Sequence, residues 1–315
     1  MKYGFQLPQI GEEIDGASIA RFARKVEEVG FHALFAGDHF VIPHEIKSVY
    51  SFKPGSKFHV AEHPNYLECY TLLTWAAAVT RRVRLCPSVM ITPYRPPVII
   101  AKVVASLDVL SGGRVIVGAG VGWMAEEFAV LGVPFKERGA RTNEYLEVCK
   151  ALWTQDNPHY EGRFYRVADL RFGPKPVQRP HPPTWIGGHS TIALERAVKM
   201  GQGWMPAGPR PAEAARLVGE LHHIAEKHGR NPDELEICLS RGIEFTKQPT
   251  TGEARRPLMG TPEQVIEDLI AYQNAGVHML RFQFRTTRVD DQIETIERLA
   301  AEVAPHVPRG PKDTP

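Results

Sequence analysis

Residues 105–128 read ASLDVLSGGRVIVGAGVGWMAEEF, and this stretch decides the fold. Apolar residues at helical spacing lead to Ser-Gly-Gly at residues 111–113, where a helix is expected to end because glycine adopts left-handed angles without a Cβ penalty. Residues 115–117 are all apolar and β-branched, which is typical of a parallel strand covered on both faces. A glycine-rich turn at 118–122 then leads into a helix that opens with two glutamates, 126–127, suited to the helix dipole. The stretch predicts a helix–strand–helix unit of an α/β protein.

The glycine-rich turn at 118–122 admits two interpretations. It is either a tight strand-to-helix connection, common in any α/β protein, or a turn that leaves backbone N–H groups open to a ligand. A dinucleotide-binding (Rossmann) fingerprint fits poorly, because the spacing is Gly-x-Gly-x-Gly and the motif lies deep in the chain. We therefore set that fold aside.

Composition is that of an ordinary globular protein. The chain has 315 residues, of which 43% are hydrophobic and 23% charged. A net charge of +2 gives no reason to expect nucleic acid or an anionic membrane as partner. The four cysteines show no C-x-x-C spacing and the histidines are dispersed, so we expect reduced thiols and no metal site. With no signal peptide and no apolar run of membrane length, a cytoplasmic location is expected.

Strand-like and helical segments alternate along the chain. Helix signals between the strands include an Asp15 cap and a Thr261-Pro262 start. Together these units predict a (β/α)₈ TIM barrel, class α/β, as one domain over residues 1–304. Insertions are expected at about 41–65 (a lid or substrate loop), 156–183 (containing a hairpin) and 246–260, and residues 305–315 are expected to be a disordered tail. The predicted strands are 3–7, 31–36, 83–91, 115–117, 184–188, 203–205, 236–243 and 278–284.

Chemistry-bearing residues are sought at the carboxyl ends of the strands, where barrel enzymes place their sites. The second strand ends at Asp38-His39. A lone histidine is more often structural, but at this position His39 can donate or accept a proton, with Asp38 orienting it. Asp108 is either a solvated helix-end residue or a second acid directed into the barrel mouth.

The fifth strand ends at Gly187, Gly188, His189 and Ser190, which open a helix. Open N–H groups at a helix start, with a hydroxyl beside them, suit a phosphate, although helix caps of this composition also occur without an anion.

Taken together, these motifs resemble the bacterial luciferase-like superfamily of flavin- and deazaflavin-dependent barrel enzymes. Within it, the chain looks like the subgroup of oxidoreductases that use the deazaflavin coenzyme F420. The matching pieces are YGFQLP at 3–8, GDHF at 37–40, SLDVLSGGRVIVGAGVGW at 106–123 and PTWIGGHS at 183–190.

The resemblance implies a cofactor site. It implies a non-prolyl cis peptide at Ser88–Val89, forming a bulge that supports the cofactor ring. It places His39 beside the reactive ring face and matches Asp108 to the family's acid. The residues it implies for cofactor binding are Ser88, Val89, Met90 and Gly120 around the ring, and Gly187, Gly188, His189 and Ser190 at the phosphate.

Two departures from the family's sugar-phosphate and alcohol dehydrogenases bear on the reaction. Pro43 stands where those enzymes carry a tryptophan, and Asp108 stands where they carry glutamate. Both weigh against a simple alcohol-dehydrogenase reaction.

Three functions follow from the resemblance. The first is hydride transfer between F420 and a small organic substrate. The second is FMN-dependent monooxygenation with O₂, in which a partner reductase supplies reduced flavin. The third is flavin binding without turnover. A homodimer is also implied. Residues 41–65, 160–165 and 246–259 are expected to supply the pocket walls.

Overall fold

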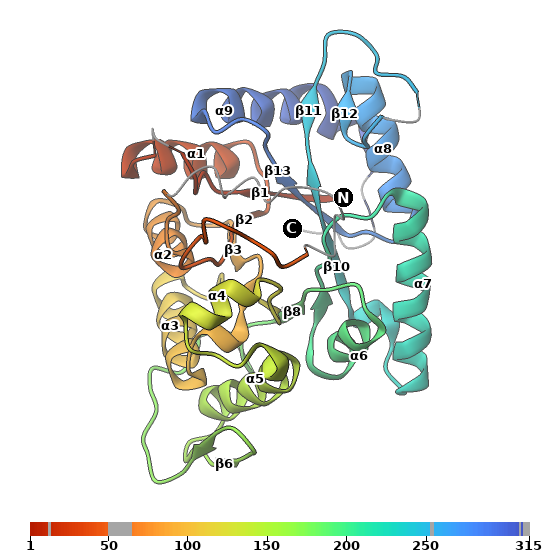
Figure 1. The fold of residues 1–315 in the computed structure, drawn as a ribbon. Coiled ribbons are helices and arrows are strands. Elements are labelled where there is room, and N and C mark those ends of the chain that lie inside the picture. Colours follow the sequence, from red (N-terminus) through yellow and green to blue (C-terminus); the bar gives the residue numbers. More distant parts are fainter. Residues whose placement is uncertain (12–13, 50–64, 253–254, 309, 311–315) are drawn as a thin grey trace.

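A parallel sheet organises the computed structural model, which describes residues 1–11, 14–49, 65–252, 255–308 and 310 (Figure 1). Its nine strands run in the order β3-β2-β1-β13-β10-β9-β8-β5-β4. They are β1 (Lys2–Gln6), β2 (Ala33–Ala36), β3 (Arg84–Pro87), β4 (Met90–Ile91), β5 (Val117–Gly120), β8 (Thr184–Ile186), β9 (Gly203–Trp204), β10 (Glu236–Gly242) and β13 (Met279–Gln283).

Strands β3 and β4 are the two halves of the single strand predicted at 83–91. The first half pairs with β2, where Ala33 faces Arg84, and the second pairs with β5, where Met90 faces Ala119. The two ends of the sheet are therefore one stretch of chain, and in the described residues the sheet fills eight barrel positions. The predicted (β/α)₈ barrel is confirmed. The break between the halves is the Ser88–Val89 peptide, which is cis as the resemblance implied.

Helices surround the strands, and the cap signals in the sequence are realised. Asp15 accepts the Ser18 N–H at 2.7 Å in a capping box, and Thr261 forms a second one. Gly112 ends a helix with φ of 70°. The helices are α1 (Gly16–Glu28), α2 (Cys69–Val79), α3 (Pro97–Ser111), α4 (Ala125–Val130), α5 (Arg138–Thr154), α6 (Thr191–Met200), α7 (Pro211–Lys227), α8 (Pro262–Asn274) and α9 (Val289–Arg298), with a π-helical extension at Leu299–Val303.

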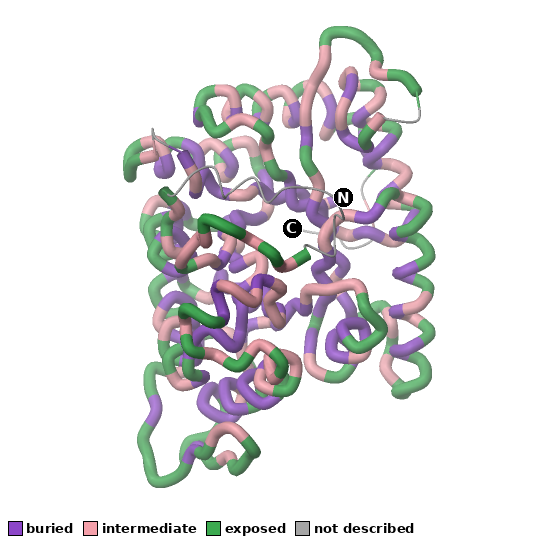
Figure 2. Tube along the Cα trace, viewed as in Figure 1, coloured by how far each residue is buried: buried purple, intermediate pink, exposed green. Residues whose placement is uncertain are grey.

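Side chains along the strands alternate between two apolar layers, as the pleat requires. On β2, Leu34 packs outward with the helices, whereas Ala33 and Phe35 point inward. The inward layer also includes Trp185 and Met205, so it fills the barrel beneath its mouth. Buried segments accordingly run along the strands and the inner helix faces (Figure 2). The filled interior leaves the ends of the strands as the place for a ligand.

The insertions differ in where they lie. The predicted hairpin is present as β6 (Tyr160–Glu161) and antiparallel β7 (Arg166–Val167). It lies beyond α5, on the far side of that helix from the strands (Figure 1), so the expectation that residues 160–165 line the pocket is wrong. Strands β11 (Glu244–Phe245) and β12 (Met259–Gly260) frame the 246–260 insertion.

The end of the chain corrects a second expectation. Residues Ala304–His306 form a 3₁₀ turn and Val307 is buried in the outer apolar layer, so the predicted disorder does not begin at residue 305. Most of the predicted lid, residues 50–64, lies outside the described residues. Across the described part of the chain, no helix combines the length and apolar character needed to span a membrane.

Candidate active site

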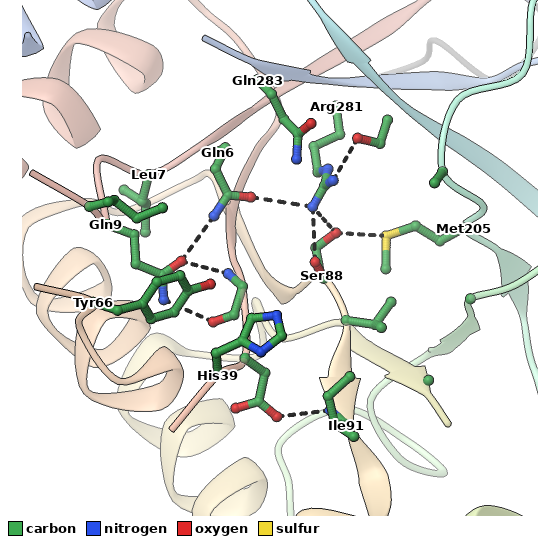
Figure 3. A pocket seen from close by; sticks show the side chains of 18 of the residues that line it. Gln6, Leu7, Gln9, His39, Tyr66, Ser88, Ile91, Met205, Arg281 and Gln283 are labelled. Atoms are coloured by element: carbon green, nitrogen blue, oxygen red, sulfur yellow. Dashed lines mark hydrogen bonds between the residues drawn. The ribbon is translucent and has the colours of Figure 1, made fainter. Parts of the chain in front are cut away.

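A cavity of about 480 Å³ opens at the carboxyl ends of the strands (Figure 3). Its wall draws on strands β1, β4, β5, β10 and β13 and on the turns that follow β2, β8 and β9. The cavity brings together seven of the residues singled out in the sequence: Asp38, His39, Ser88, Val89, Gly120, Gly187 and Gly188.

Val89 stands on one wall of this cavity because two glycines make room for it. A Cβ on Gly120 would collide with the Val89 methyl Cγ2, and one on Gly187 would lie 3.0 Å from Cγ1. Glycine at both positions lets the strand ends approach the Val89 side chain and presents an apolar surface bordered by backbone. Such a surface fits the flat ring of a flavin or deazaflavin.

His39 is held by a carboxylate from α4. Its Nδ1 lies 2.7 Å from Oε2 of Glu127, which is fully buried. Glu127 also accepts the Tyr94 hydroxyl at 2.8 Å and the Phe40 N–H at 2.6 Å. Burial alone would raise the pKa of Glu127, but the hydrogen bonds from His39, Phe40 and Tyr94 hold it below its ordinary value. The carboxylate is therefore ionised and serves only as an acceptor.

Asp38 does not orient His39, which corrects the sequence-based expectation. Its carboxylate accepts hydrogen bonds from both terminal nitrogens of Arg95, at 2.7 and 2.6 Å, and from the Ile91 N–H at 2.8 Å. Burial would lower the pKa of Arg95, but the contact with Asp38 raises it above the usual value. Asp38 and Arg95 thus form a buried bidentate ion pair that ties the end of β2 to β4.

Arg281 supplies a cation to the floor of the cavity. It comes from β13, is 7% exposed, and donates to the Ser88 carbonyl at 3.0 Å and to the Ser88 hydroxyl (Figure 3). It also donates to the Ser240 hydroxyl at 2.5 Å and to the Gln6 side chain at 3.3 Å. Arg281 therefore fixes the strand ends around Ser88 while placing its charge beside them.

A second cavity of about 1200 Å³ adjoins the first along the Gly187–Gly188 turn. His189 and Ser190 lie here, and the Ser190 hydroxyl caps α6 by accepting the Ala193 N–H at 3.3 Å. Burial lowers the pKa of His189, with a smaller opposing effect from Glu213. Among the described residues, the ionised side chains along its wall are one glutamate, Glu213, and five arginines: Arg138, Arg196, Arg210, Arg241 and Arg256.

Two sequence-based site residues lie elsewhere. Asp108 accepts the Gln178 amide at 2.7 Å and the Val115 N–H at 3.4 Å, at the amino end of β5. Because α3 runs antiparallel to the strands, its last turn lies at the end of the barrel opposite the cavity, so the expectation of an acid in the mouth is wrong. Met90 faces outward and accepts the Tyr70 hydroxyl, because Val89 and Ile91 on either side of it face the cavity.

Sequence reasoning missed Glu127 and Arg281. In the sequence Glu127 reads only as a helix-opening charge, and nothing local reveals that its side chain reaches back to the turn after β2. Arg281 did carry a signal: a charged residue amid the apolar run 278–284, at an inward-facing position. The arginines of the second cavity are spread over residues 138–256 and have no common motif.

A family model described as luciferase-like monooxygenase matches residues 4–251. The chain belongs to this family. Two relatives of the luciferase-like family show its range of cofactors. The F420-dependent glucose-6-phosphate dehydrogenase of Amycolatopsis mediterranei is 30% identical, over 84% of this chain and 76% of its own. The FMNH₂-dependent dimethylsulfone monooxygenase of Pseudomonas putida is 34% identical, over 62% of this chain and 53% of its own.

Solved structures of the same fold include a monooxygenase and an F420-dependent reductase. Monooxygenase RslO1 from Streptomyces bottropensis superposes with a TM-score of 0.80 at 22% identity, covering 97% of this chain and 99% of that one. The F420-dependent tetrahydromethanopterin reductase from Methanopyrus kandleri gives 0.77 at 19% identity, covering 98% and 99%. The chain is thus an oxidoreductase of a family that uses F420 or FMN.

Proposed function

We propose that this protein exchanges hydride between the deazaflavin F420 and a small organic molecule. The observation that carries the choice of F420 is the arginine-lined second cavity beside the Gly187–Gly188 turn. When bound, F420 supplies hydride transfer at a ring carbon that replaces the nitrogen through which FMN reacts with O₂.

The second cavity suits a side chain with several negative charges. FMN ends in one phosphate, whereas the side chain of F420 continues from a phosphodiester into glutamate carboxylates. Five arginines against one glutamate exceed what a single phosphate needs. Burial lowers the pKa of Arg196 and Arg241 because it removes water from the charged guanidinium groups. Anionic groups bound beside them would offset part of this desolvation cost.

Buried Arg241 carries this argument furthest. Its Nη1 donates to the Gly208 carbonyl at 2.5 Å, while its buried Nε has no hydrogen-bond partner among the described residues. A buried guanidinium N–H without an acceptor is costly, and a carboxylate or phosphate oxygen would satisfy it.

The first cavity carries few full charges, so it suits a small organic substrate. Among the described residues of its wall, full charges belong to Asp38 and Arg281, and Asp38 is neutralised by Arg95. Apart from the His39 imidazole and the Trp123 indole, the other polar side chains are mostly amides and hydroxyls, including Gln6, Gln283 and Thr287. We propose that His39 takes or returns the substrate proton here, because it is the imidazole on this wall.

The alternative is an FMN-dependent monooxygenase supplied by a partner reductase. It is favoured by the dimethylsulfone monooxygenase relative and by the match to the monooxygenase family model. In this alternative, FMN would place only one phosphate in the second cavity, so several of its arginines would have no contact with the cofactor.

Fluorescence titrations with F420 and with FMN test the proposal. We expect tighter binding of F420, and a loss of about 10- to 150-fold in its affinity in Arg241→Met, since a charge-assisted hydrogen bond contributes about 1.5–3 kcal/mol. FMN affinity should change less. Arg216→Ala, which removes an exposed arginine paired with Glu220 on α7, is the matched control. Preference for FMN, or equal losses for both ligands, would overturn the assignment of F420.

A further inference from the structure

The Glu127 carboxylate has four hydrogen-bond donors around it and no exposure to solvent. Oε1 accepts the N–H groups of Phe40 at 2.6 Å and Val41 at 3.3 Å. Oε2 accepts the Tyr94 hydroxyl at 2.8 Å and faces His39 Nδ1 at 2.7 Å. Each oxygen is thus occupied by two groups, and the arrangement leaves the carboxylate one orientation.

This arrangement decides which nitrogen of His39 carries the proton. An ionised carboxylate can only accept, so the hydrogen of the 2.7 Å contact must sit on Nδ1. In the neutral ring, Nε2 is then the nitrogen with the lone pair. His39 lines the cavity with its Nδ1 side fixed, so proton exchange with a substrate falls to Nε2.

We infer that Glu127 is the positioning residue of His39, holding the imidazole as the Nδ1–H tautomer so that Nε2 exchanges a proton with the substrate. The inference rests on the proposed function for the role of His39. When a substrate heteroatom gives up its proton, its bond to hydrogen breaks and an Nε2–H bond forms, while the hydride removed in the same oxidation would pass to the bound F420. The resulting imidazolium lies against the Glu127 carboxylate, which stabilises its charge until the proton is returned.

The adjacent acid on the same helical turn provides a matched comparison. Glu126 turns away from His39, and its Oε1 accepts the N–H groups of Lys47 at 2.7 Å and Ser48 at 2.9 Å. The Ser48 hydroxyl in turn accepts the Ala125 N–H at 2.9 Å, at the start of α4. Two neighbouring glutamates thus hold the two ends of one loop, and only Glu127 reaches the imidazole.

Glu127→Gln tests the inference because it places a hydrogen-bond donor, instead of an acceptor, opposite Nδ1 of His39. The glutamine oxygen must face the two backbone N–H groups of Phe40 and Val41, which places the NH₂ group opposite His39. That group donates to Nδ1 and moves the ring proton to Nε2. We therefore expect the opposite tautomer, a turnover lower by about 10²- to 10⁴-fold, and F420 affinity within about twofold of the wild type.

The tautomer is measured by long-range ¹H–¹⁵N correlation on protein with ¹⁵N-labelled histidine, without cofactor. The spectrum of His39→Gln identifies the signals of His39. Wild type and Glu126→Gln are expected to show Nδ1–H, and Glu127→Gln to show Nε2–H. Tyr94→Phe keeps the carboxylate and is expected to keep Nδ1–H, so it provides a second test should Glu127→Gln fail to fold.

The following outcomes would overturn the inference. An Nδ1–H tautomer in Glu127→Gln, or an Nε2–H tautomer in Tyr94→Phe or the wild type, overturns it whatever the turnover. A reversed tautomer with unchanged turnover overturns the catalytic role. Wild-type protein that binds F420 but turns nothing over would count against the proposed function, while the spectra still decide whether Glu127 sets the tautomer.

Discussion

Asp38→Asn separates a structural ion pair from a catalytic carboxylate. The Asp38 and Arg95 side chains are 1% and 9% exposed and joined by two hydrogen bonds. In the variant, one oxygen becomes an NH₂ group facing a guanidinium donor, so one charge-assisted bond and the countercharge are lost. Removing one partner of a buried pair costs about 3–5 kcal/mol. Glu68, 3.1 Å from Arg95, remains as a second acid, which favours the lower end, about 3 kcal/mol.

A loss of that size is measurable by heat and by urea. At about 2–4 °C per kcal/mol for a large domain, we expect Tm to fall by about 6–12 °C. The matched control is Asp290→Asn, which breaks an exposed pair with Arg21 at the same 2.6 Å distance and should cost less than about 1 kcal/mol. If Asp38→Asn melts with the wild type but loses turnover, Asp38 acts in the chemistry and the ion-pair argument is refuted.

Three further predictions follow from individual residues. Gly120→Ala should weaken cofactor binding about 5- to 150-fold in a fluorescence titration, because the new methyl displaces Val89; Gly219→Ala, with open space around it, should bind normally. Iodoacetamide at pH 8 should label no cysteine until the protein is denatured, as read by mass spectrometry, because all four are buried and burial raises the pKa of Cys86 to about 12; labelling of native protein would contradict this. The lowered pKa of Glu127 gives stability that is full above its ordinary value of 4.5 and is lost as the pH falls through the folded-state value. Urea midpoints of wild type and Glu127→Gln should therefore converge on acidification, and a constant gap would count against an ionised Glu127.

The barrel was predictable because its signals are local. A β-branched run followed by glycines marks β5, and the caps at Asp15 and Thr261 mark the starts of α1 and α8. Each signal depends on a few consecutive residues and does not depend on which other parts of the chain pack against them. The cis peptide at Ser88–Val89, in contrast, was implied by the family resemblance and not by a local signal.

The partners of the site residues were not predictable for the opposite reason. Asp38 precedes His39 in the chain, yet their side chains diverge at the strand end, and the imidazole meets Glu127 from α4, 88 positions away. Asp108 carries the right chemical group at the wrong end of the barrel. Asp108 differs from the other site residues in this respect: it lies in the last turn of the helix before β5, and in a (β/α)₈ barrel that turn lies at the amino ends of the strands, so the predicted fold alone argues against an acid in the mouth.

The division of one strand between β3 and β4 affects how ligand binding changes the stability of the barrel. Strands β2 and β5 do not pair with each other, yet both are hydrogen-bonded to the stretch that contains Ser88 and Val89. A ligand resting on Val89 therefore bridges the line along which the barrel closes. Binding should then slow the hydrogen–deuterium exchange of backbone amides in both β2 and β5, so that one small molecule stabilises the closure of the barrel.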